Sequence, residues 1–264
     1  MGAARGAAGD GADGLNMETL SVLQLLFCVV VVTVAFAVRG GTGFGGGAIA
    51  VPLLALVFPL QVTVPVVTVL NMLSSVGHGI TGWRHIVWPA IWRMVPGSLA
   101  GVLIGLYLLT LIDPRPLAKA LGVFVMLYAL YVLLLAGREF KVPSRWMAVI
   151  TVVTSFSAGL IGSLFGGAAG PIYVVYLNTL RLARDAFRVT ITTIMLFQGT
   201  ARTAGYAMLG FYDGQALLLL AAALPTMLLG SWLGARLIRR FNPLWFNRAV
   251  GGVLLISGAA LVYR

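Results

Sequence analysis

Long apolar runs separated by short polar connections dominate the chain. Most runs have roughly 17 to 23 residues, the length that an α-helix needs to cross the hydrocarbon core of a bilayer. Ten such segments can be drawn, five in each half, at about 20–38, 44–60, 63–83, 90–111, 117–136, 146–161, 165–180, 187–209, 215–238 and 246–263. The pattern predicts an all-α, polytopic integral membrane protein.

Composition supports this prediction, because 60% of the residues are hydrophobic, 9% are charged and the mean hydropathy is +1.00. A net charge of +11 would suggest nucleic acid as the partner of a soluble protein, but the basic side chains lie mainly between the apolar runs, where they orient a chain in the membrane. The lipid bilayer, and no nucleic acid, is therefore the expected partner. A single cysteine, Cys28, excludes an intramolecular disulfide and a multi-cysteine metal site, and we expect neither metal nor cofactor.

A phenylalanine between clustered glycines occurs twice, in a motif that interrupts the apolar pattern. The first copy is Gly41-Thr42-Gly43-Phe44-Gly45-Gly46-Gly47, and the second, 121 residues later, is Gly162-Ser163-Leu164-Phe165-Gly166-Gly167-Ala168. A further register supports a repeat: at a spacing of 129, Pro96 matches Pro225, Gly101 matches Gly230, Gly105 matches Gly234, Pro114 matches Pro243 and Gly122 matches Gly251. The Gly-x-x-x-Gly pairs at 101–105 and 230–234 are interpreted as helix-packing positions.

These repeats predict the domain organisation. We expect a disordered tail over 1–17, a first transmembrane repeat over 18–137, a cytoplasmic linker over 138–145 and a second repeat over 146–264. The short second segment of each half leaves two arrangements open, either a full span or a re-entrant hairpin with the segment before it. Each half then has an odd number of crossings in both arrangements, so we expect two inverted-topology repeats with glycine-rich breaks near the midplane.

Basic residues set the expected orientation. One face collects Arg39, Arg84, Arg138, Lys141, Arg145, Arg181, Arg184, Arg188, Arg236, Arg239, Arg240 and Arg248, while the other has Arg5, Arg115, Lys119 and Arg264. This asymmetry places the first face in the cytoplasm and both termini in the periplasm of a bacterial inner membrane. A hairpin would leave the loops on the same sides but would move Arg39 towards the membrane interior.

Acidic residues are absent from the middle of every predicted span. All seven lie in the tail or at segment boundaries: Asp10, Asp13, Glu18, Asp113, Glu139, Asp185 and Asp213. This distribution argues against the carboxylate relays of many proton-driven cation pumps, and against intramembrane proteases that need paired Asp or His-Glu-x-x-His.

Cationic side chains, by contrast, do fall inside predicted spans. Arg202 lies in the middle of 187–209 and Arg93 at the start of 90–111. A charge at this depth needs a cavity or a partner, and with no carboxylate nearby in sequence we expect an anionic substrate to be the partner of Arg202. For Arg93 we favour a side chain that reaches the membrane interface.

Polar residues at helical spacing form one stripe on each of two corresponding segments. The stripes comprise Asn71, Ser74 or Ser75, and His78 on the third segment, and Gln198 and Arg202 on the eighth. Two interpretations remain open, namely hydrogen bonds between packed helices and a shared substrate cavity.

The glycine breaks could themselves hold an anion. Where a helix begins at membrane depth, its first N–H groups are unpaired and its dipole presents partial positive charge. Two opposed helix N-termini, with hydroxyls from the motifs, would then bind an oxyanion together with the polar stripes. The predicted substrate-binding residues are Thr42, Gly43, Phe44, Gly45, Gly46, Asn71, His78, Ser163, Phe165, Gly166, Gly167, Gln198 and Arg202. The alternative is that the glycines serve packing alone.

Three stretches resemble the TauE/SafE family of sulfite and organosulfonate exporters: 41–52, the repeat at 162–171, and 233–240. The resemblance covers about 20–263 and implies a small sulfur-containing oxyanion moved across the bacterial inner membrane. The second motif departs from the first, with Leu164 in place of Gly43 and Ala168 in place of Gly47, so the two half-sites need not contribute equally.

The sequence thus predicts a secondary transporter, and not an enzyme, that exports a small anionic substrate such as sulfite or a sulfonate by alternating access. A passive anion channel of the same architecture is the first alternative, and a membrane-embedded enzyme or non-transporting subunit is a less favoured one. Direction of transport, the coupling ion and a homodimeric state stay open.

Overall fold

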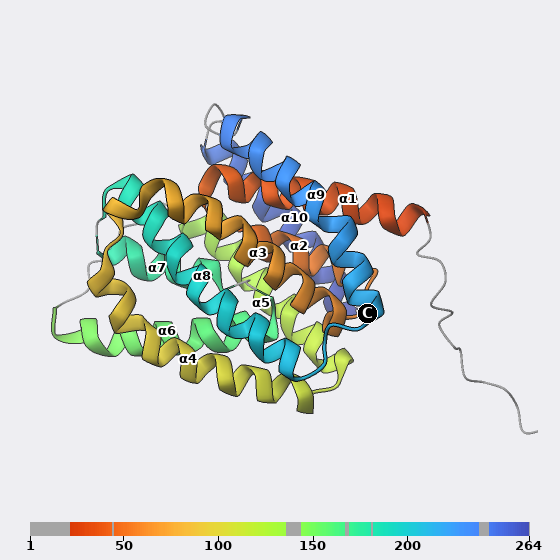
Figure 1. Cartoon of the computed structure of the whole chain (residues 1–264), viewed down its shortest axis with the longest axis horizontal. Helices are drawn as coiled ribbons and strands as arrows, with labels where there is room; N and C mark the ends of the chain where they lie inside the picture. Colours follow the sequence, from red (N-terminus) through yellow and green to blue (C-terminus); the bar gives the residue numbers. More distant parts are fainter. Residues whose placement is uncertain are drawn as a thin grey trace, which may run out of the picture.

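The computed structural model describes residues 22–43, 45–135, 144–166, 169–180, 182–237 and 243–263, and in these ranges it contains ten α-helices and no β-strand (Figure 1). The helices are α1 (Val22–Thr42), α2 (Gly46–Leu54), α3 (Leu60–Gly82), α4 (Trp88–Leu111), α5 (Pro114–Leu135), α6 (Met147–Leu164), α7 (Gly170–Thr179), α8 (Arg184–Met208), α9 (Gly214–Leu237) and α10 (Pro243–Tyr263). The predicted tail at 1–17 and most of the predicted linker at 138–145 lie outside the described residues. The all-α prediction is confirmed.

Five of these helices, α1, α4, α5, α6 and α9, are long and apolar enough to cross a membrane. Their outward faces carry large aliphatic side chains, such as Leu103 of α4 and Leu127 of α5, which are 68% and 63% exposed. A soluble protein would bury such residues, whereas lipid is as apolar as leucine. The polytopic membrane prediction is therefore confirmed as well.

Helices α2 and α7 are too short to span. They contain nine and ten residues, which at 1.5 Å per residue gives about 14 and 15 Å, roughly half of the ~30 Å hydrocarbon core. A Cβ added at Gly46, the first residue of α2, would lie 3.2 Å from Asn71 Oδ1 in the middle of α3. Helix α2 begins at that level and then leads back to the start of α3. Of the two arrangements that the sequence left open, this geometry favours the hairpin.

Glycines let four pairs of helices approach closely. The principal contacts join α1 to α9, α4 to α6, α3 to α8 and α5 to α10, and Figure 1 places the α1–α9 and α4–α6 pairs on opposite sides of α3 and α8. Cβ atoms at Gly230 and Gly234 would collide with the backbone of α1 at Thr33 and Ala37. A Cβ at Gly101 would collide with the backbone of α6 in the same way. The packing interpretation of these glycines is confirmed.

The pairing follows an exchange rule between the two halves of the chain. The first helix of each half packs against the fourth helix of the other half, and the third and fifth helices each pack against their own counterparts. In the α5–α10 pair, a Cβ at Gly122 would touch Val262 and one at Gly251 would touch Leu133. Gly122 and Gly251 are 129 residues apart in the sequence, and so are Leu133 and Val262. The two contacts are therefore equivalent, and the two helices are antiparallel. Two repeats related by a two-fold axis in the membrane plane would produce this pattern.

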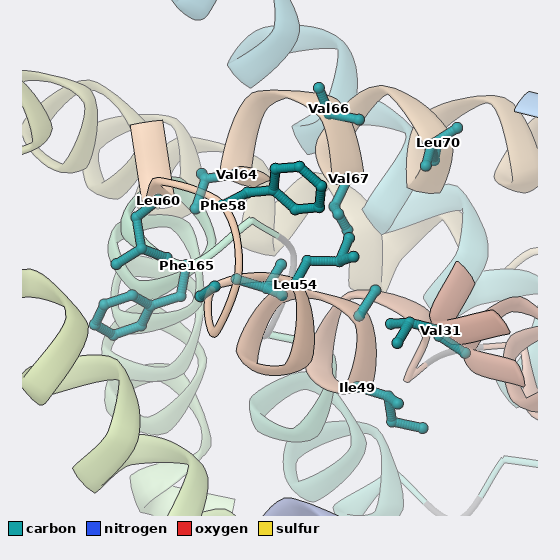
Figure 2. Close-up of a cluster of buried hydrophobic side chains, with 14 of the residues drawn as sticks. Val31, Ile49, Leu54, Phe58, Leu60, Val64, Val66, Val67, Leu70 and Phe165 are labelled. Atoms are coloured by element: carbon teal, nitrogen blue, oxygen red, sulfur yellow. The ribbon is translucent and has the colours of Figure 1, made fainter. Parts of the chain in front are cut away.

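Part of the largest hydrophobic cluster surrounds α2 and the start of α3 (Figure 2). Leu54, Phe58 and Leu60 close the turn between the two helices, and Phe165 from the second glycine motif packs into the same cluster. Phe165 also stacks on Phe124 of α5 at 5.8 Å between ring centroids. Apolar packing therefore anchors the second break to the first half of the chain.

Candidate functional site

Asn71, in the middle of α3, links the two glycine breaks. Its Nδ2 donates a 3.4 Å hydrogen bond to the carbonyl oxygen of Gly166 in the second break. Its Oδ1 lies beside Gly46 in the first break, where an added Cβ would approach Oδ1 to 3.2 Å and Arg39 Cδ to 3.1 Å. The two interruptions, far apart in sequence, therefore meet at one residue, and the absence of a side chain at Gly46 permits the contact.

Arg39 lies near the end of α1, on the chain entering the first break, and is 1% exposed. Its Nη2 donates to the carbonyl oxygen of Asn71 at 3.1 Å and to Ser75 Oγ at 2.5 Å, and its Nη1 contacts Met195 Sδ at 3.5 Å. Its Nε has no hydrogen-bond partner in the described part of the chain. Helices α3 and α8 thus hold this side chain, and its Nε donor stays available.

Arg202 enters the same region from α8 and is 2% exposed. Neither its Nε nor its Nη1 has a hydrogen-bond partner among the residues that the structure describes. A Cβ at Gly162 of α6 would collide with Nη1, so the glycine leaves the space that the guanidinium occupies. The positive charges of Arg39 and Arg202 interact unfavourably with each other.

Two tyrosines of the second half complete the surroundings of Arg202. Both phenol groups interact with it electrostatically, namely those of Tyr173 on α7 and Tyr206 on α8. Tyr206 donates to the carbonyl oxygen of Ser163 at 2.5 Å, which ties α8 to the end of α6. Gln198 Nε2 donates to the Tyr173 hydroxyl. These contacts fix the helices around Arg202 but leave its charge uncompensated.

Several buried polar atoms here have no partner within the described ranges. They are Arg39 Nε, Asn71 Oδ1, Gln198 Oε1, Arg202 Nε and Arg202 Nη1. Leaving one buried polar group unsatisfied costs about 1–3 kcal/mol, and more for a charged group. Five such atoms on α1, α3 and α8 are therefore typical of a site that water or a ligand completes.

No carboxylate of the described chain balances the two arginines. The acidic residues in these ranges are Asp113, Asp185 and Asp213, and each lies at the beginning of a helix. Asp213 accepts a hydrogen bond from the backbone of Ala216, at the start of α9. The electrostatics of the region therefore favour an anion.

Three of the predicted side chains, Asn71, Gln198 and Arg202, lie in the interior of the protein. All three are buried, at 5%, 3% and 2% exposure. His78 belongs to α3, but its side chain lies outside the described part of the structure. Phe44 and Gly167 also fall outside the described residues.

The predicted backbone positions behave as breaks. Gly43 and Gly45 have φ values of 87° and 92°, and Gly166 has 59°, all in the left-handed region that favours glycine. Gly45 is the N-cap of α2, and no side chain caps that helix end. The first N–H groups of a helix have no intrahelical acceptor, so the start of α2 offers backbone donors beside Asn71 and Arg39.

The two predicted hydroxyls donate hydrogen bonds to the backbone. Thr42 Oγ1 donates to the carbonyl oxygen of Val38 at 2.9 Å, and Ser163 Oγ donates to that of Gly159 at 3.0 Å. Each bond lies within its own helix. Phe165, also predicted to bind substrate, is 5% exposed in the hydrophobic cluster. In this conformation these three residues support the backbone of the breaks.

Two arginines of the region are not among the substrate-binding residues predicted from the sequence. The sequence places Arg39 on the cytoplasmic face, or towards the membrane interior if the first two segments form a hairpin, and its burial agrees with the hairpin. Arg188, counted with the loop cations, lies near the start of α8, where its Nη2 donates to the carbonyl oxygen of Gly40 at 2.7 Å. A Cβ at Gly43 would lie 2.9 Å from Arg188 Cγ, so this side chain covers the first break. The signal that could have found Arg39 is its position two residues before the motif.

Comparisons with known proteins agree with an anion-handling membrane protein. The family model described as sulfite exporter TauE/SafE matches residues 27–261. A protein of Comamonas testosteroni named "Probable inner membrane transporter protein TsaS" is 28% identical over 200 residues, which are 74% of this chain and 80% of that protein. A protein of Cupriavidus necator named "Probable sulfite/organosulfonate exporter TauE" is 25% identical over 231 residues, 84% of this chain and 87% of that protein. No solved structure matches.

Proposed function

This chain belongs to the sulfite exporter TauE/SafE family, and we propose that it is a secondary transporter that moves a small sulfur oxyanion, sulfite or an organosulfonate, out across the bacterial inner membrane by alternating access. The names of the family and of both relatives describe transport, so the chain is a transporter rather than an enzyme. The chemistry of the substrate comes from the family description and from the relative in Cupriavidus necator.

One observation carries the binding-site proposal: Arg202 is 2% exposed, and both its Nε and its Nη1 lack a partner in the described chain. The anion lies between the two breaks, where the guanidinium of Arg202 and the first N–H groups of α2 supply positive charge and donors. Asn71 and Gln198 line the same region, and His78 stays a candidate from the sequence alone. The glycines allow the backbone to approach the anion closely.

Transport by alternating access requires the two breaks to become accessible from each side in turn. The α1–α2 and α6–α7 hairpins meet at Asn71, and each is tied to a helix of the other half by close glycine contacts. Small shifts of these packed pairs would change access to the region between the breaks.

The test of function is Arg202→Met in purified protein. The change keeps much of the side-chain length but removes the charge and the donors, so affinity for sulfite or thiosulfate should fall by about 2 kcal/mol or more, the scale of truncating a buried charge partner. Isothermal titration measures the affinity, and counterflow of labelled sulfite in proteoliposomes measures transport. Arg93→Met, at an exposed arginine of α4, is the matched control.

Unchanged affinity with lower stability in Arg202→Met would assign this arginine to structure alone. Unitary currents without saturable counterflow would make the protein a channel.

The orientation we propose has the connection between α7 and α8 in the cytoplasm and both termini in the periplasm, as the distribution of basic residues requires. A cysteine introduced at Leu182, in a Cys28→Ala background, tests this assignment. In intact cells an impermeant thiol reagent should leave that cysteine unlabelled and should label one introduced before α1. The reverse pattern would invert the topology.

A further inference from the structure

Two buried guanidinium groups, carried by opposite halves of the chain, share one region of the interior. Arg39 is 1% exposed and Arg202 is 2% exposed, and Arg39 Nη1 contacts Met195 on α8, the helix that carries Arg202. Like charges in a low-dielectric interior are costly, and desolvation adds to the cost for each group. Negative charge between or beside the two groups would lower this cost.

The protein itself supplies only neutral partners in the described ranges. Arg39 donates to a carbonyl oxygen, a hydroxyl and a thioether. Around Arg202 the electrostatic neighbours are the phenol groups of Tyr173 and Tyr206. These groups satisfy hydrogen bonds and orient the side chains, but they leave two full positive charges. Arg188 adds a further positive charge near the first break, so an anion with two negative charges is stabilised more here than an anion with one.

We propose that Arg39 and Arg202 together select a small, doubly charged oxyanion over singly charged or zwitterionic sulfonates. The inference rests on the function proposed above and narrows its substrate class. Arg39 Nε, Arg202 Nε and Arg202 Nη1 are three donors without a partner in the described chain, enough for the several oxygens of one oxyanion. Sulfite in its fully deprotonated form, thiosulfate and sulfate have this chemistry.

An aminosulfonate fits the same region poorly. Its ammonium group would lie near two guanidinium groups and would find no carboxylate of the described chain to accept it. Two amide oxygens without a partner, Asn71 Oδ1 and Gln198 Oε1, offer only neutral acceptors. Like-charge repulsion of this kind discriminates between ligands as effectively as an attractive contact does.

A glycine lies beside each of the two arginines. Gly46 lies against the aliphatic part of the Arg39 side chain, and Gly162 lies against the guanidinium group of Arg202. A Cβ at Gly46 would come within 3.1 Å of Arg39 Cδ, and one at Gly162 would collide with Arg202 Nη1. The backbone therefore packs directly against each arginine side chain.

The experiment compares four ligands at constant ionic strength on the purified full chain: sulfate and thiosulfate as dianions, methanesulfonate as a monoanion and taurine as a zwitterion. In the wild-type protein, titration calorimetry should find the dianions at least tenfold tighter than methanesulfonate, with taurine weakest. Arg39→Gln should weaken the dianions at least tenfold but methanesulfonate less than threefold, so that the preference collapses. Arg93→Gln, at an exposed position of α4, should leave all four affinities unchanged.

Each result decides. Equal wild-type affinity for methanesulfonate and the dianions overturns the selection by charge, and so does an Arg39→Gln variant that weakens both classes equally. The wild-type ranking needs no variant, so it decides even if Arg39→Gln fails to fold. If no anion binds the wild type at all, the proposed function fails instead. If Arg202→Gln loses dianion binding while Arg39→Gln keeps the wild-type affinities, the proposed function stands and the selection by Arg39 is overturned.

Discussion

The two glycine breaks have similar sequences, but they receive positive charge in different ways. At the first break the charge comes from the hairpin itself, because Arg39 lies on α1 and reaches Ser75 of α3. At the second break the hairpin contributes Gly162, and the charge comes from Arg202 of α8, which fills the space beside it. A site between two similar half-sites can thus be asymmetric in chemistry, with one arginine on the hairpin and the other on the long helix facing it.

Steric fit differs between the breaks as well. Gly45 at the first break has open surroundings, and the nearest atom to an added Cβ is Val38 Cγ1 at 3.6 Å. At Gly166 an added Cβ would lie 2.9 Å from Val51 Cγ2 and 3.1 Å from the backbone of Val64. The second break is therefore built into the hydrophobic cluster, whereas the first is limited mainly by backbone conformation.

The largest effect is expected from Gly162→Val compared with Gly46→Ala. The valine must displace the Arg202 guanidinium, because even its Cβ would collide with Nη1, and anion binding should fall below detection. The alanine at Gly46 meets Arg39 and Asn71 at 3.1 and 3.2 Å, so it should weaken binding about tenfold, or roughly 1.4 kcal/mol. Titration with thiosulfate measures both. Normal binding by a folded Gly162→Val protein would remove Arg202 from the anion site.

A smaller effect separates Gly166→Ala from Gly45→Ala. Both place a side chain at positive φ, which costs about 1–3 kcal/mol, but only Gly166→Ala also pushes against Val51 and Val64. We expect Gly166→Ala to lower the thermal midpoint more than Gly45→Ala does, measured by thermal unfolding in the same detergent. Equal destabilisation would mean that the hydrophobic cluster yields easily around the second break.

The smallest effects are expected from Thr42→Val and Ser163→Ala. Both hydroxyls donate to a carbonyl oxygen four residues earlier in their own helix. Their loss should change stability by less than about 1 kcal/mol and anion affinity by less than threefold. A tenfold loss of thiosulfate affinity in either variant would mean that the hydroxyl binds the substrate, as the sequence predicts.

Much of the architecture could be predicted because it depends on local patterns. The ten helices, the two breaks and the packing role of Gly101 and Gly230 follow from apolar length and small residues at helical spacing. Asn71, Gln198 and Arg202 could be predicted to lie inside the protein, since polar groups in long apolar segments avoid lipid. These properties need no knowledge of which helices are neighbours.

What faces the breaks depends on contacts between distant segments, and only the tertiary structure decided it. Arg39 is buried because α1 ends against α3 and α8, and Arg188 covers Gly43 because α8 begins beside that end. The sequence allowed a span or a hairpin after α1, since both give the same pattern of apolar residues and loop charges. Thr42, Ser163 and Phe165 occupy motif positions, but the turn of the chain directs their side chains to their own helices or to the core. Hydropathy determines how deep a residue lies, whereas packing of the halves determines which atom it faces.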